Sequence, residues 1–411
     1  MYAAAVRGAD PEAAVTRALA GVSARDRLWI IAIGKAAIPM ARGALSRLAQ
    51  DGRRPTGGLV VAPRPLAGTA LELPVLPGDH PLPDEHSVRA AEAIGALAGE
   101  TRPDDEVWVL LSGGTSSLIG APLPGGSLRG LREVFRAISR SGLDITAANE
   151  VRRRFLRWGG GRLADALGHT AMRVFAISDV PGDDPTVIGS GPCSPDPLSA
   201  ADVKARLEGH GLLATLPSEV AAMLDRVMAG TDPETPKPRA ITQVPHRIVL
   251  RNADALEAAA AEARRRNYFA DIVGALEGEA RDIGTRLGQR VRDAAPGSCL
   301  LWGGESTVTL GSSTGHGGRS QELALAAARP LAGGSASLLA AGTDGRDGPT
   351  DAAGAIVDGT TLDRVRAAGH DPETALERHN AYPALDAAGA LFRPGLTGTN
   401  VMDLVIGLRP R

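Results

Sequence analysis

Short apolar runs that end on small residues alternate along the chain with alanine-rich segments of helical length. The runs LWIIAIG (28–34), GGLVVAP (57–63) and VWVLLSGG (107–114) predict buried strands. A fourth run, beginning RVFAISD at residue 173, also leads into a loop. Because these strands alternate with helices and lack β-hairpin signals, they predict a mainly parallel sheet with both faces covered.

A stretch rich in proline and polar residues, TDPETPKPRAITQVPH (231–246), interrupts this alternation. Further strand-like runs follow it, including SCLLWGGESTVTL (298–310) and ASLLAAGTDG (336–345). A chain of 411 residues is long for a single core. We therefore expect two α/β domains, a larger one over residues 1–240 and a smaller one over 241–411.

Composition and charge exclude several classes of protein. Aromatic residues make up 3% of the chain and the formal net charge is −2, so the sequence predicts no nucleic-acid or membrane-surface binding. Two short arginine clusters, 152–154 and 264–266, are expected to form solvated helix faces. With two cysteines, no signal-peptide pattern and no apolar stretch of 18 residues, we expect a soluble, cytoplasmic protein.

Four glycine-rich turns follow strand-like runs and precede helical segments. They are IAIGKAA (31–37), LLSGGTSSL (110–118), LLWGGEST (300–307) and GSSTGHGGRSQELALAAA (311–328). Glycine lets the backbone approach a ligand, and N–H groups at a helix start attract anions. Lys35 and Arg319 lie beside two of these turns, where a cation adds charge-assisted bonds to phosphate. Together the turns favour phosphate or carboxylate binding.

The known nucleotide signatures are absent. The chain contains no G-x-x-x-x-G-K-[ST], no G-x-G-x-x-G and no protein-kinase motif set. One competing motif is GSSTG (311–315), a match to the G-x-S-x-G of serine hydrolases with Ser313 as nucleophile. A nucleophile elbow requires the helix to start directly after the serine, whereas STGHGGR intervenes here, so we disfavour this alternative.

Acidic loops follow strands in both predicted domains. One contains Asp179, Asp183 and Asp184, and the other contains Asp344, Asp347 and Asp351. Each aspartate taken singly suits a turn or a helix cap. As a group they also suit Mg²⁺, which phosphoryl transfer needs and which one or two carboxylates can hold. His80, in GDHPLP, fits a turn at least as well as a catalytic role.

Taken in order, these segments resemble the type 2 glycerate kinases, whose C-terminal part is named for its MOFRL motif. The resemblance covers nearly the whole chain, from GKAA to TGTNVMDL. Its most specific pieces are GDHPLPDE (78–85), LLSGGTSSL, NEVRR with GGRLA (149–164), ISDVPGDDPTVIGSGPCSPDP (177–197), GGESTVTL, GHGGRSQELALAAA and GTDGRDGPTDAAGAIVDG (342–359).

The resemblance implies a Rossmann-like N-terminal domain, a smaller C-terminal α/β domain and an active site in the cleft between them. It implies transfer of the ATP γ-phosphoryl to the 2-hydroxyl of D-glycerate with Mg²⁺, and it assigns the catalytic lysine to Lys35 and the catalytic arginine to Arg319. It leaves a homodimer open. Together with the turns it gives these further candidates: Ser112, Gly113, Gly114, Ser116, Gly303, Gly304, Glu305, Gly317 and Gly318 for nucleotide or phosphate; Asn149, Arg152 and Asp179 for the substrate; and Asp179, Asp344 and Asp347 for the metal.

The chain departs from the family pattern at five positions that bear on the acceptor. They are Arg154, Leu156, Gly159, Ser320 and Met402. Because these segments are expected to face the cleft, two alternatives stay open beside glycerate kinase. One is a kinase of the same family for another small hydroxyacid, such as a four-carbon sugar acid, and the other is a binding homologue without turnover.

Overall fold

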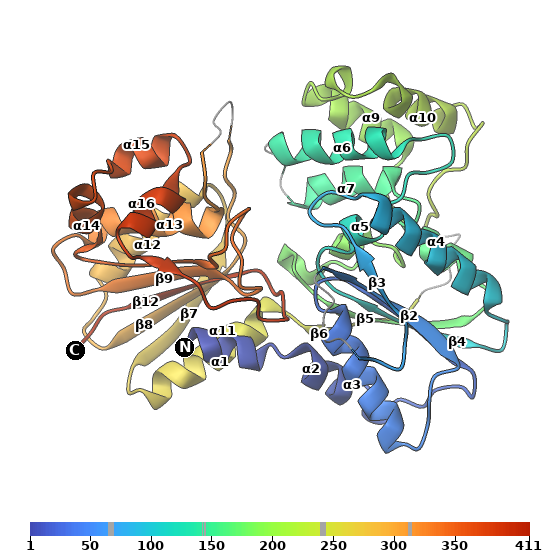
Figure 1. Ribbon diagram of the computed structural model, residues 1–411, viewed down its shortest axis with the longest axis horizontal. Helices are drawn as coiled ribbons and strands as arrows, with labels where there is room; N and C mark the ends of the chain where they lie inside the picture. The colour runs from blue at the N-terminus through green and yellow to red at the C-terminus, as the bar shows by residue number, and fades with distance from the viewer. Residues whose placement is uncertain (65–69, 142, 144, 239–243, 311–314) are drawn as a thin grey trace. The chain divides into compact units, whose positions relative to one another are not determined.

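The computed structural model describes residues 1–64, 70–141, 143, 145–238, 244–310 and 315–411. These residues divide into two compact units, one of Pro11–Leu250 and one of Met1–Asp10 together with Arg251–Arg411 (Figure 1). Each unit contains one six-stranded sheet. The predicted fold class, α/β with two domains, is confirmed.

The sheet of the first unit is parallel throughout, with the strand order β3-β2-β1-β4-β5-β6. Every residue of β1 and β4 is buried, as expected for central strands of a sheet covered on both faces. The strands are β1 (Leu28–Ile33), β2 (Gly57–Pro63), β3 (Val75–Gly78), β4 (Glu106–Leu111), β5 (Ala171–Ile177) and β6 (His246–Leu250).

Helices cover both faces of this sheet. Residues of α4 (Glu85–Glu100) and α8 (Arg162–Ala166) share one core with β1, β4 and β5. The helices α2 (Pro11–Ala18) and α3 (Ala37–Gln50) contact the sheet as well, through β6 and through β1, β2 and β4 respectively. The short helix α5 (Thr115–Leu118) follows β4 directly.

Four further helices form a layer of their own in the first unit (Figure 1). Their apolar faces share one cluster, which contains Phe135, Val151 and Leu207. Ser127 caps the start of α6 by accepting from the Gly130 N–H, and Ser199 with Asp202 forms a capping box at α9. The helices are α6 (Leu128–Arg140), α7 (Ile145–Phe155), α9 (Ala200–Gly209) and α10 (Ser218–Met228).

The second sheet is mixed, with the order β11-β10-β9-β12-β8-β7. Only β7 and β8 pair in parallel; the other neighbouring strands are antiparallel. The mainly parallel sheet predicted for the N-terminal domain is therefore confirmed, and the second sheet differs from it in being mixed. The strands are β7 (Phe269–Leu276), β8 (Ser298–Gly304), β9 (Ser337–Gly342), β10 (Gly354–Asp358), β11 (Leu391–Phe392) and β12 (Asp403–Leu408).

Helices lie on both sides of this sheet too (Figure 1). One side carries α12 (Ala280–Arg292), α13 (Arg319–Leu331), α14 (Thr361–Ala367), α15 (Pro372–Glu377) and α16 (Ala381–Ala387), whose buried residues form one core with β8, β9, β10 and β12. The other side carries α11 (Asn252–Arg265), against which α1 (Tyr2–Gly8) packs.

The observed division of the chain differs from the expected one in two places. Strand β6 pairs with β5 and so belongs to the first unit, whereas the sequence placed residues 241–250 in the second domain. The first ten residues belong to the second unit, because α1 packs on α11. The run predicted to be strand through Leu310 ends as a strand at Gly304.

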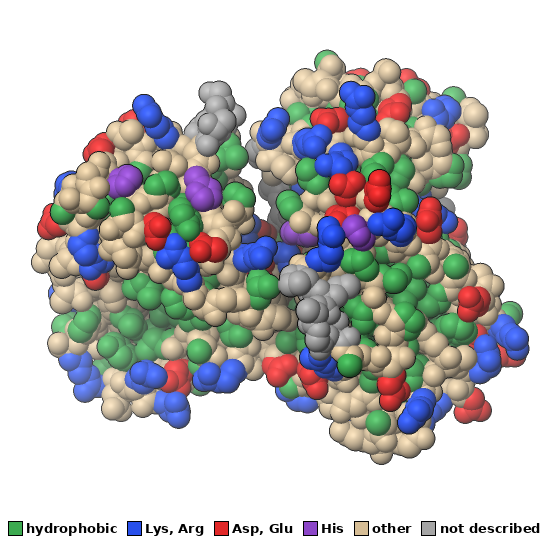
Figure 2. Space-filling model, in the orientation of Figure 1, with side chains coloured by type: hydrophobic (Ala, Val, Ile, Leu, Met, Phe, Trp, Pro, Cys, Tyr) green, Lys and Arg blue, Asp and Glu red, His purple; other side chains and the backbone are tan. Residues whose placement is uncertain are grey.

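Charged side chains are mixed in sign on the face that Figure 2 shows, as expected for a nearly neutral chain. The cluster Arg264–Arg266 is exposed, and Arg265 and Arg266 both pair with Glu262, which confirms the predicted solvated face. Within the described residues we find no helix whose length and hydropathy would let it span a bilayer.

Candidate active site

The first unit brings Lys35 and the turn after β4 together at the point where the strand order reverses. From β1 the chain proceeds outward to β2 and β3, and from β4 it proceeds in the opposite direction to β5 and β6. Because β1 and β4 are parallel neighbours, their following turns meet at one edge of the sheet. This switch point is where open α/β sheets bind ligands.

Two backbone contacts join these turns. The Lys35 N–H donates to the Gly113 carbonyl at 2.8 Å, and the Ala36 N–H donates to Ser112 Oγ at 3.0 Å. Gly34 has a φ of +132°, and a Cβ there would lie 2.1 Å from Ser112 Oγ. The close approach of the two turns thus requires glycine at position 34.

Gly114 lies next to the side chains of Lys35 and His80. A Cβ on it would be 3.3 Å from Cγ of Lys35 and 3.2 Å from Cδ2 of His80. His80 is exposed and follows β3, and Ser117 Oγ donates to the neighbouring Pro81 carbonyl at 2.6 Å. The structure therefore adds His80, which the sequence left undecided, to the group around Lys35.

A loop after β5 connects the remaining candidates of the first unit. Ser190 Oγ lies 2.6 Å from Ser116 Oγ, and the Val187 carbonyl accepts from Nδ2 of Asn149 at 3.2 Å. Nη1 of Arg152 donates to Oδ1 of Asn149 at 3.2 Å. Asp179 is half-buried and follows β5, one strand further from the switch point.

The arginine cluster on α7 is not the solvated face that the sequence predicted. Arg153 and Arg154 are 1% and 2% exposed, and both pair with the buried Asp196. Arg154 also pairs with Glu234. Burial of a cation is costly unless it is paired, and helical spacing alone does not reveal a partner more than 40 residues away.

The departures from the family pattern have interior positions. Leu156, Ser320 and Met402 are 3%, 2% and 7% exposed. A Cβ on Gly159 would lie 2.6 Å from the Arg153 carbonyl, so a side chain at position 159 would meet the end of α7. These residues fill space inside the units, so they give little reason to expect an acceptor other than D-glycerate.

In the second unit, Arg319 is the first residue of α13 and lies among carboxylates. Its Nε donates to Oδ2 of Asp403 at 2.5 Å and its Nη2 donates to Oδ1 at 3.1 Å. Its Nη1 pairs with Glu305, which follows β8. These acids raise the pKa of Arg319 against the opposing effect of its burial, so it stays charged.

Asp347 caps the start of α13. Its carboxylate accepts from the backbone N–H groups of Ser320 at 3.2 Å and Gln321 at 2.8 Å. Burial, and then the nearby Asp403, raise its pKa to about 7 against the lowering effect of those N–H groups and Arg319. A Cβ on Gly318 would lie 2.2 Å from Oδ1 of Asp347.

The other candidates of the second unit lie at the same sheet edge. Gly304 and Gly342 end β8 and β9, and both pair with Asp403 at the start of the antiparallel β12. Oδ1 of Asp344 accepts from the Arg346 N–H at 3.0 Å. A Cβ on Gly303 would lie 1.7 Å from Oδ1 of Asn252, so this glycine makes room for α11, and Gly317 lies beside the backbone of Ala381 and Tyr382.

The metal candidates differ in their suitability. Across the described part of the chain, no group of three or more His, Cys, Asp or Glu side chains is arranged to hold a metal ion. The Asp347 carboxylate already serves the N-terminus of α13, whereas one or two carboxylates suffice for Mg²⁺ that also binds phosphates. Asp344 in the second unit and Asp179 in the first fit that role better than Asp347.

Sequence reasoning missed Asp403 and Ser190. Asp403 opens the apolar run DLVIGL, and a single charge before a buried strand was the available signal. Ser190 has a φ of +65° and is fully buried, a conformation that the flanking glycines of IGSG indicated only indirectly. Ser313, the alternative hydrolase nucleophile, lies outside the described residues.

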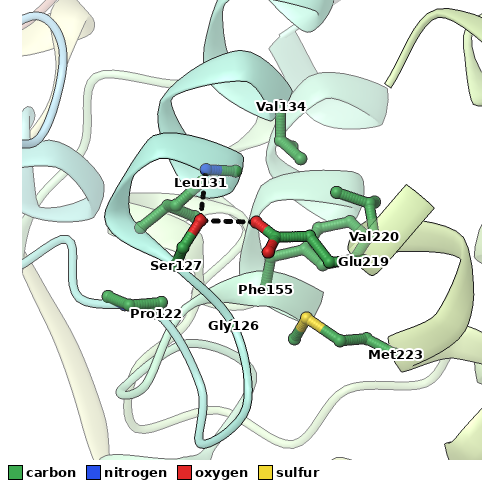
Figure 3. Close-up of a pocket in the computed structure, with 10 residues that line it drawn as sticks. Pro122, Gly126, Ser127, Leu131, Val134, Phe155, Glu219, Val220 and Met223 are labelled. Carbon is green, nitrogen blue, oxygen red and sulfur yellow. Dashed lines mark hydrogen bonds between the residues drawn. The ribbon is translucent and has the colours of Figure 1, made fainter. Parts of the chain in front are cut away.

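A small cavity in the helical layer lies apart from these candidates (Figure 3). It measures about 10 Å³ and is lined by Leu131, Val134, Met223 and other residues of α6, α7 and α10. Ser127 donates to the Glu219 carboxylate at its rim. Its volume is that of a single water, too small for a substrate.

Comparison with known proteins gives matches over most of the chain. The family described as "Domain of unknown function (DUF4147)" matches residues 1–225, and the MOFRL family matches residues 298–403. Glycerate 2-kinase of Pyrococcus horikoshii is 36% identical, covering 98% of this chain and 94% of that protein.

Two further comparisons cover nearly the same extent. A protein of Agrobacterium vitis named putative hydroxypyruvate reductase is 40% identical, covering 98% of this chain and 92% of that one. The crystal structure of glycerate kinase from Thermotoga maritima matches with a TM-score of 0.81 and 33% identity, covering 99% and 97% of the two chains.

Proposed function

The chain belongs to the glycerate kinase family whose C-terminal part is the MOFRL family, and from this premise we propose that it is an ATP-dependent D-glycerate 2-kinase. The reaction moves the γ-phosphoryl of ATP to the 2-hydroxyl of D-glycerate. The products are 2-phosphoglycerate and ADP.

One observation carries the proposal. Lys35, in the turn after β1, lies against Gly114 in the turn after β4, at the switch point of a parallel sheet. The position is one at which such sheets bind nucleotides and other small ligands. A lysine there gives a positive charge to phosphate oxygens, and the turn Ser112–Ser116 offers small side chains and backbone amides.

Phosphoryl transfer asks the protein for positioning and charge rather than for covalent chemistry. Lys35 and Arg319 would offset the charge of the transferring phosphoryl group. The turns of Gly113, Gly114, Gly304 and Gly318 would approach the phosphates closely. Asn149 and Arg152 would bind the carboxylate of the acid, since Arg152 provides the cation and Asn149 orients it.

The fit of Mg²⁺ follows from the carboxylates described above. When bound, Mg²⁺ offsets the charge of the triphosphate. Asp344 or Asp179 would hold it. Either carboxylate would alternatively accept the proton of the acceptor hydroxyl, and substitution of each by Asn distinguishes the roles, because loss of a metal ligand raises the Mg²⁺ concentration needed for half activity.

The test is ADP release measured with D-glycerate, L-glycerate, tartronate and erythronate. We expect turnover with D-glycerate, and coupling to enolase identifies 2-phosphoglycerate as the product. Lys35→Ala and Arg319→Ala should each lower kcat by roughly 10²–10³. Lys204→Ala is the control, because Lys204 pairs with Asp225 at the surface of the helical layer. Full turnover in both site variants would remove these residues from the mechanism.

The name of the Agrobacterium vitis relative motivates one alternative. The strand order of the first sheet also occurs in dinucleotide-binding folds. The sequence IAIGKAA after β1 nevertheless lacks the G-x-G-x-x-G fingerprint. Oxidation of NADH or NADPH by hydroxypyruvate, in the absence of ADP release from any acid, would favour the reductase over the kinase.

A further inference from the structure

Arg319 meets two carboxylates at different sides of its guanidinium group. The Asp403 carboxylate accepts hydrogen bonds from Nε and Nη2 together, in the bidentate geometry that fixes the plane of a guanidinium. The Glu305 carboxylate pairs with the third nitrogen, Nη1. One cation therefore faces two anions, and an approaching phosphate or carboxylate meets an excess of negative charge.

The two carboxylates differ in how firmly the fold holds them. The Asp403 side chain is 7% exposed, and its backbone pairs with Gly304 on one side and Gly342 on the other. The Asp403 carbonyl also accepts from Nδ2 of Asn252 at 3.1 Å. A side chain on a central strand with both neighbours paired has little freedom to leave.

Glu305 lies just beyond the end of β8, and its side chain is 19% exposed. The Arg319 side chain is 34% exposed, so the pair of Glu305 with Nη1 lies toward solvent while the pair with Asp403 lies inside. The pair with Glu305 is only partly buried, and an oxyanion that replaces Glu305 at Nη1 keeps the guanidinium paired, so the exchange avoids the cost of leaving a buried cation without an anion.

We propose that Asp403 is the positioning residue that fixes the Arg319 guanidinium, and that Glu305 is an internal counter-ion which a substrate oxyanion displaces from Nη1. The oxyanion is a phosphoryl or a carboxylate group, because both match the guanidinium edge. The inference rests on the proposed function only in taking Arg319 to bind a substrate oxyanion. Glu305 thus lowers anion affinity in the resting protein, and Asp403 keeps the arginine aligned after the exchange.

The role of Asp403 is tested by steady-state kinetics of Asp403→Asn. The amide keeps the size and one acceptor but loses the charge and the bidentate grip. We expect kcat to fall about 10- to 100-fold while the KM for the acid stays constant or falls, since the alignment is lost and the site becomes less negative. In an Arg319→Lys background the same change should cost little, because lysine makes no bidentate pair.

Unchanged kcat, or equal losses in both backgrounds, would overturn the positioning role. Asp386→Asn is the matched control, because Asp386 pairs with Arg393 on the surface of the same unit. It should leave kcat and KM unaltered.

The role of Glu305 is tested without turnover, by calorimetric titration with inorganic phosphate. Glu305→Gln should bind phosphate roughly 10-fold more tightly than the wild type, since a competing charge is gone. The gain should vanish in Glu305→Gln/Arg319→Met. Equal, weaker or undetectable binding by Glu305→Gln would overturn the proposal, as would a gain that survives the loss of Arg319.

Competition identifies the natural oxyanion. Displacement of phosphate from Glu305→Gln by D-glycerate assigns Nη1 to the acid carboxylate, and displacement by a non-hydrolysable ATP analogue assigns it to the γ-phosphoryl group. Displacement by neither ligand would contradict the inference. Because these titrations need no catalysis, the two proposals fail independently. A chain inactive toward every acid would refute the proposed function, and the phosphate titration would still test the role of Glu305.

Discussion

Gly114 has a φ of +85° and lies in contact range of both Lys35 and His80. Alanine at this position costs about 1–2 kcal/mol of stability because of the left-handed backbone. Its Cβ would also press against the aliphatic part of the Lys35 side chain. We expect Gly114→Ala to lower kcat about 10- to 100-fold, because a small displacement of a positioned cation is costly. Gly52→Ala is the control: its φ of +67° carries the same backbone cost, but its Cβ would meet no atom within 4 Å.

Urea unfolding and steady-state rates of both glycine variants separate the two effects. Similar losses of stability with a loss of kcat at position 114 alone would support the site. Equal kcat in the two variants would show that the contacts with Lys35 and His80 have no catalytic consequence.

Asp347 gives a pH dependence whose sign follows from its pKa of about 7, raised from 3.8. Between these values the folded protein binds more protons than the unfolded chain, so this residue's contribution to stability is present below about pH 4 and is lost as pH rises toward 7. Asp347→Asn keeps a capping side chain and removes the titration. The free energy of unfolding of the wild type, measured with urea, should fall relative to that of the variant between pH 5 and 8, by on the order of 1–4 kcal/mol.

Asp371 provides the matched control for this pH profile. It caps α15 by accepting from the Thr374 N–H, and hydrogen bonds to Thr374 lower its pKa. A lowered pKa gives stability that is lost only as pH falls below the unfolded value, so Asp371→Asn should not alter the slope between pH 5 and 8. A parallel course of wild type and Asp347→Asn across that range would contradict the raised pKa.

At this scale, sequence reasoning found side chains next to small residues and missed side chains whose partners are distant. Lys35 was picked out by the glycine before it, and in the structure it contacts the turn after β4. The pairing of Arg319 with Asp403 spans 84 residues, and that of Arg154 with Asp196 spans 42. No local pattern reports such a pair, because it arises only when separate strands and loops meet.

At the scale of elements, α7 depends on an arginine that lies beyond its end. Nη1 of Arg162 donates to the carbonyls of Arg153, Leu156 and Gly159 at 3.1–3.2 Å, and these include the last turn of α7. Burial, with the nearby Arg154, lowers the pKa of Arg162 to about 10, so it remains charged at neutral pH. Arg162 thereby gives a donor to the Arg153 carbonyl, one of the carbonyls that a helix end leaves without partners in the helix, while the Leu156 and Gly159 carbonyls also accept from backbone N–H groups.

Arg162→Met should therefore destabilise the protein by about 1–3 kcal/mol, since the Arg153 carbonyl loses a donor that methionine cannot replace and the carbonyls of Leu156 and Gly159 each lose one of theirs. The KM for the acid should rise as well, because α7 carries Asn149 and Arg152. Urea unfolding and acid titration kinetics measure both effects. Arg140→Met, at the exposed end of α6, is the control, and equal stability of the two variants would show that the cap contributes nothing.

Strands β1, β2, β4 and β5 of the first unit were predictable because buried parallel strands are continuous apolar runs. The predicted strands at 28–34 and 57–63 correspond to β1 and β2 within one residue. Apolar runs do not encode strand direction, so the antiparallel pairing of β12 with β8 and β9 was not foreseeable. The alternation of polar and apolar residues in STVTL (306–310) predicted a strand there, but β8 ends at Gly304.

At the scale of the whole molecule, the first ten residues belong to a unit whose remaining residues begin at Arg251. The hydroxyl of Tyr2 donates to the Gly342 carbonyl at 2.7 Å, and its ring meets Phe392 edge-on at 4.9 Å between centroids. A Cβ on Gly8 would lie 2.3 Å from Cβ of Ala258, so α1 and α11 pack closely. A division drawn from chain order alone assigns such a segment to the wrong unit.

Tyr2→Ala should consequently weaken the second unit and spare the first, although α2 of the first unit begins at Pro11, three residues after the end of α1. The change removes a buried aromatic ring that is 7% exposed and a hydrogen bond at the end of β9, which together cost about 3–5 kcal/mol. Hydrogen exchange of the intact chain measures the effect: amides of α11, β9 and β11 should exchange faster, and those of β1, β4 and β5 should not. Val15→Ala, which truncates a buried residue of α2, should give the opposite distribution. Faster exchange in β1 and β4 of Tyr2→Ala would mean that α1 stabilises the unit next to it in sequence, contrary to the observed packing.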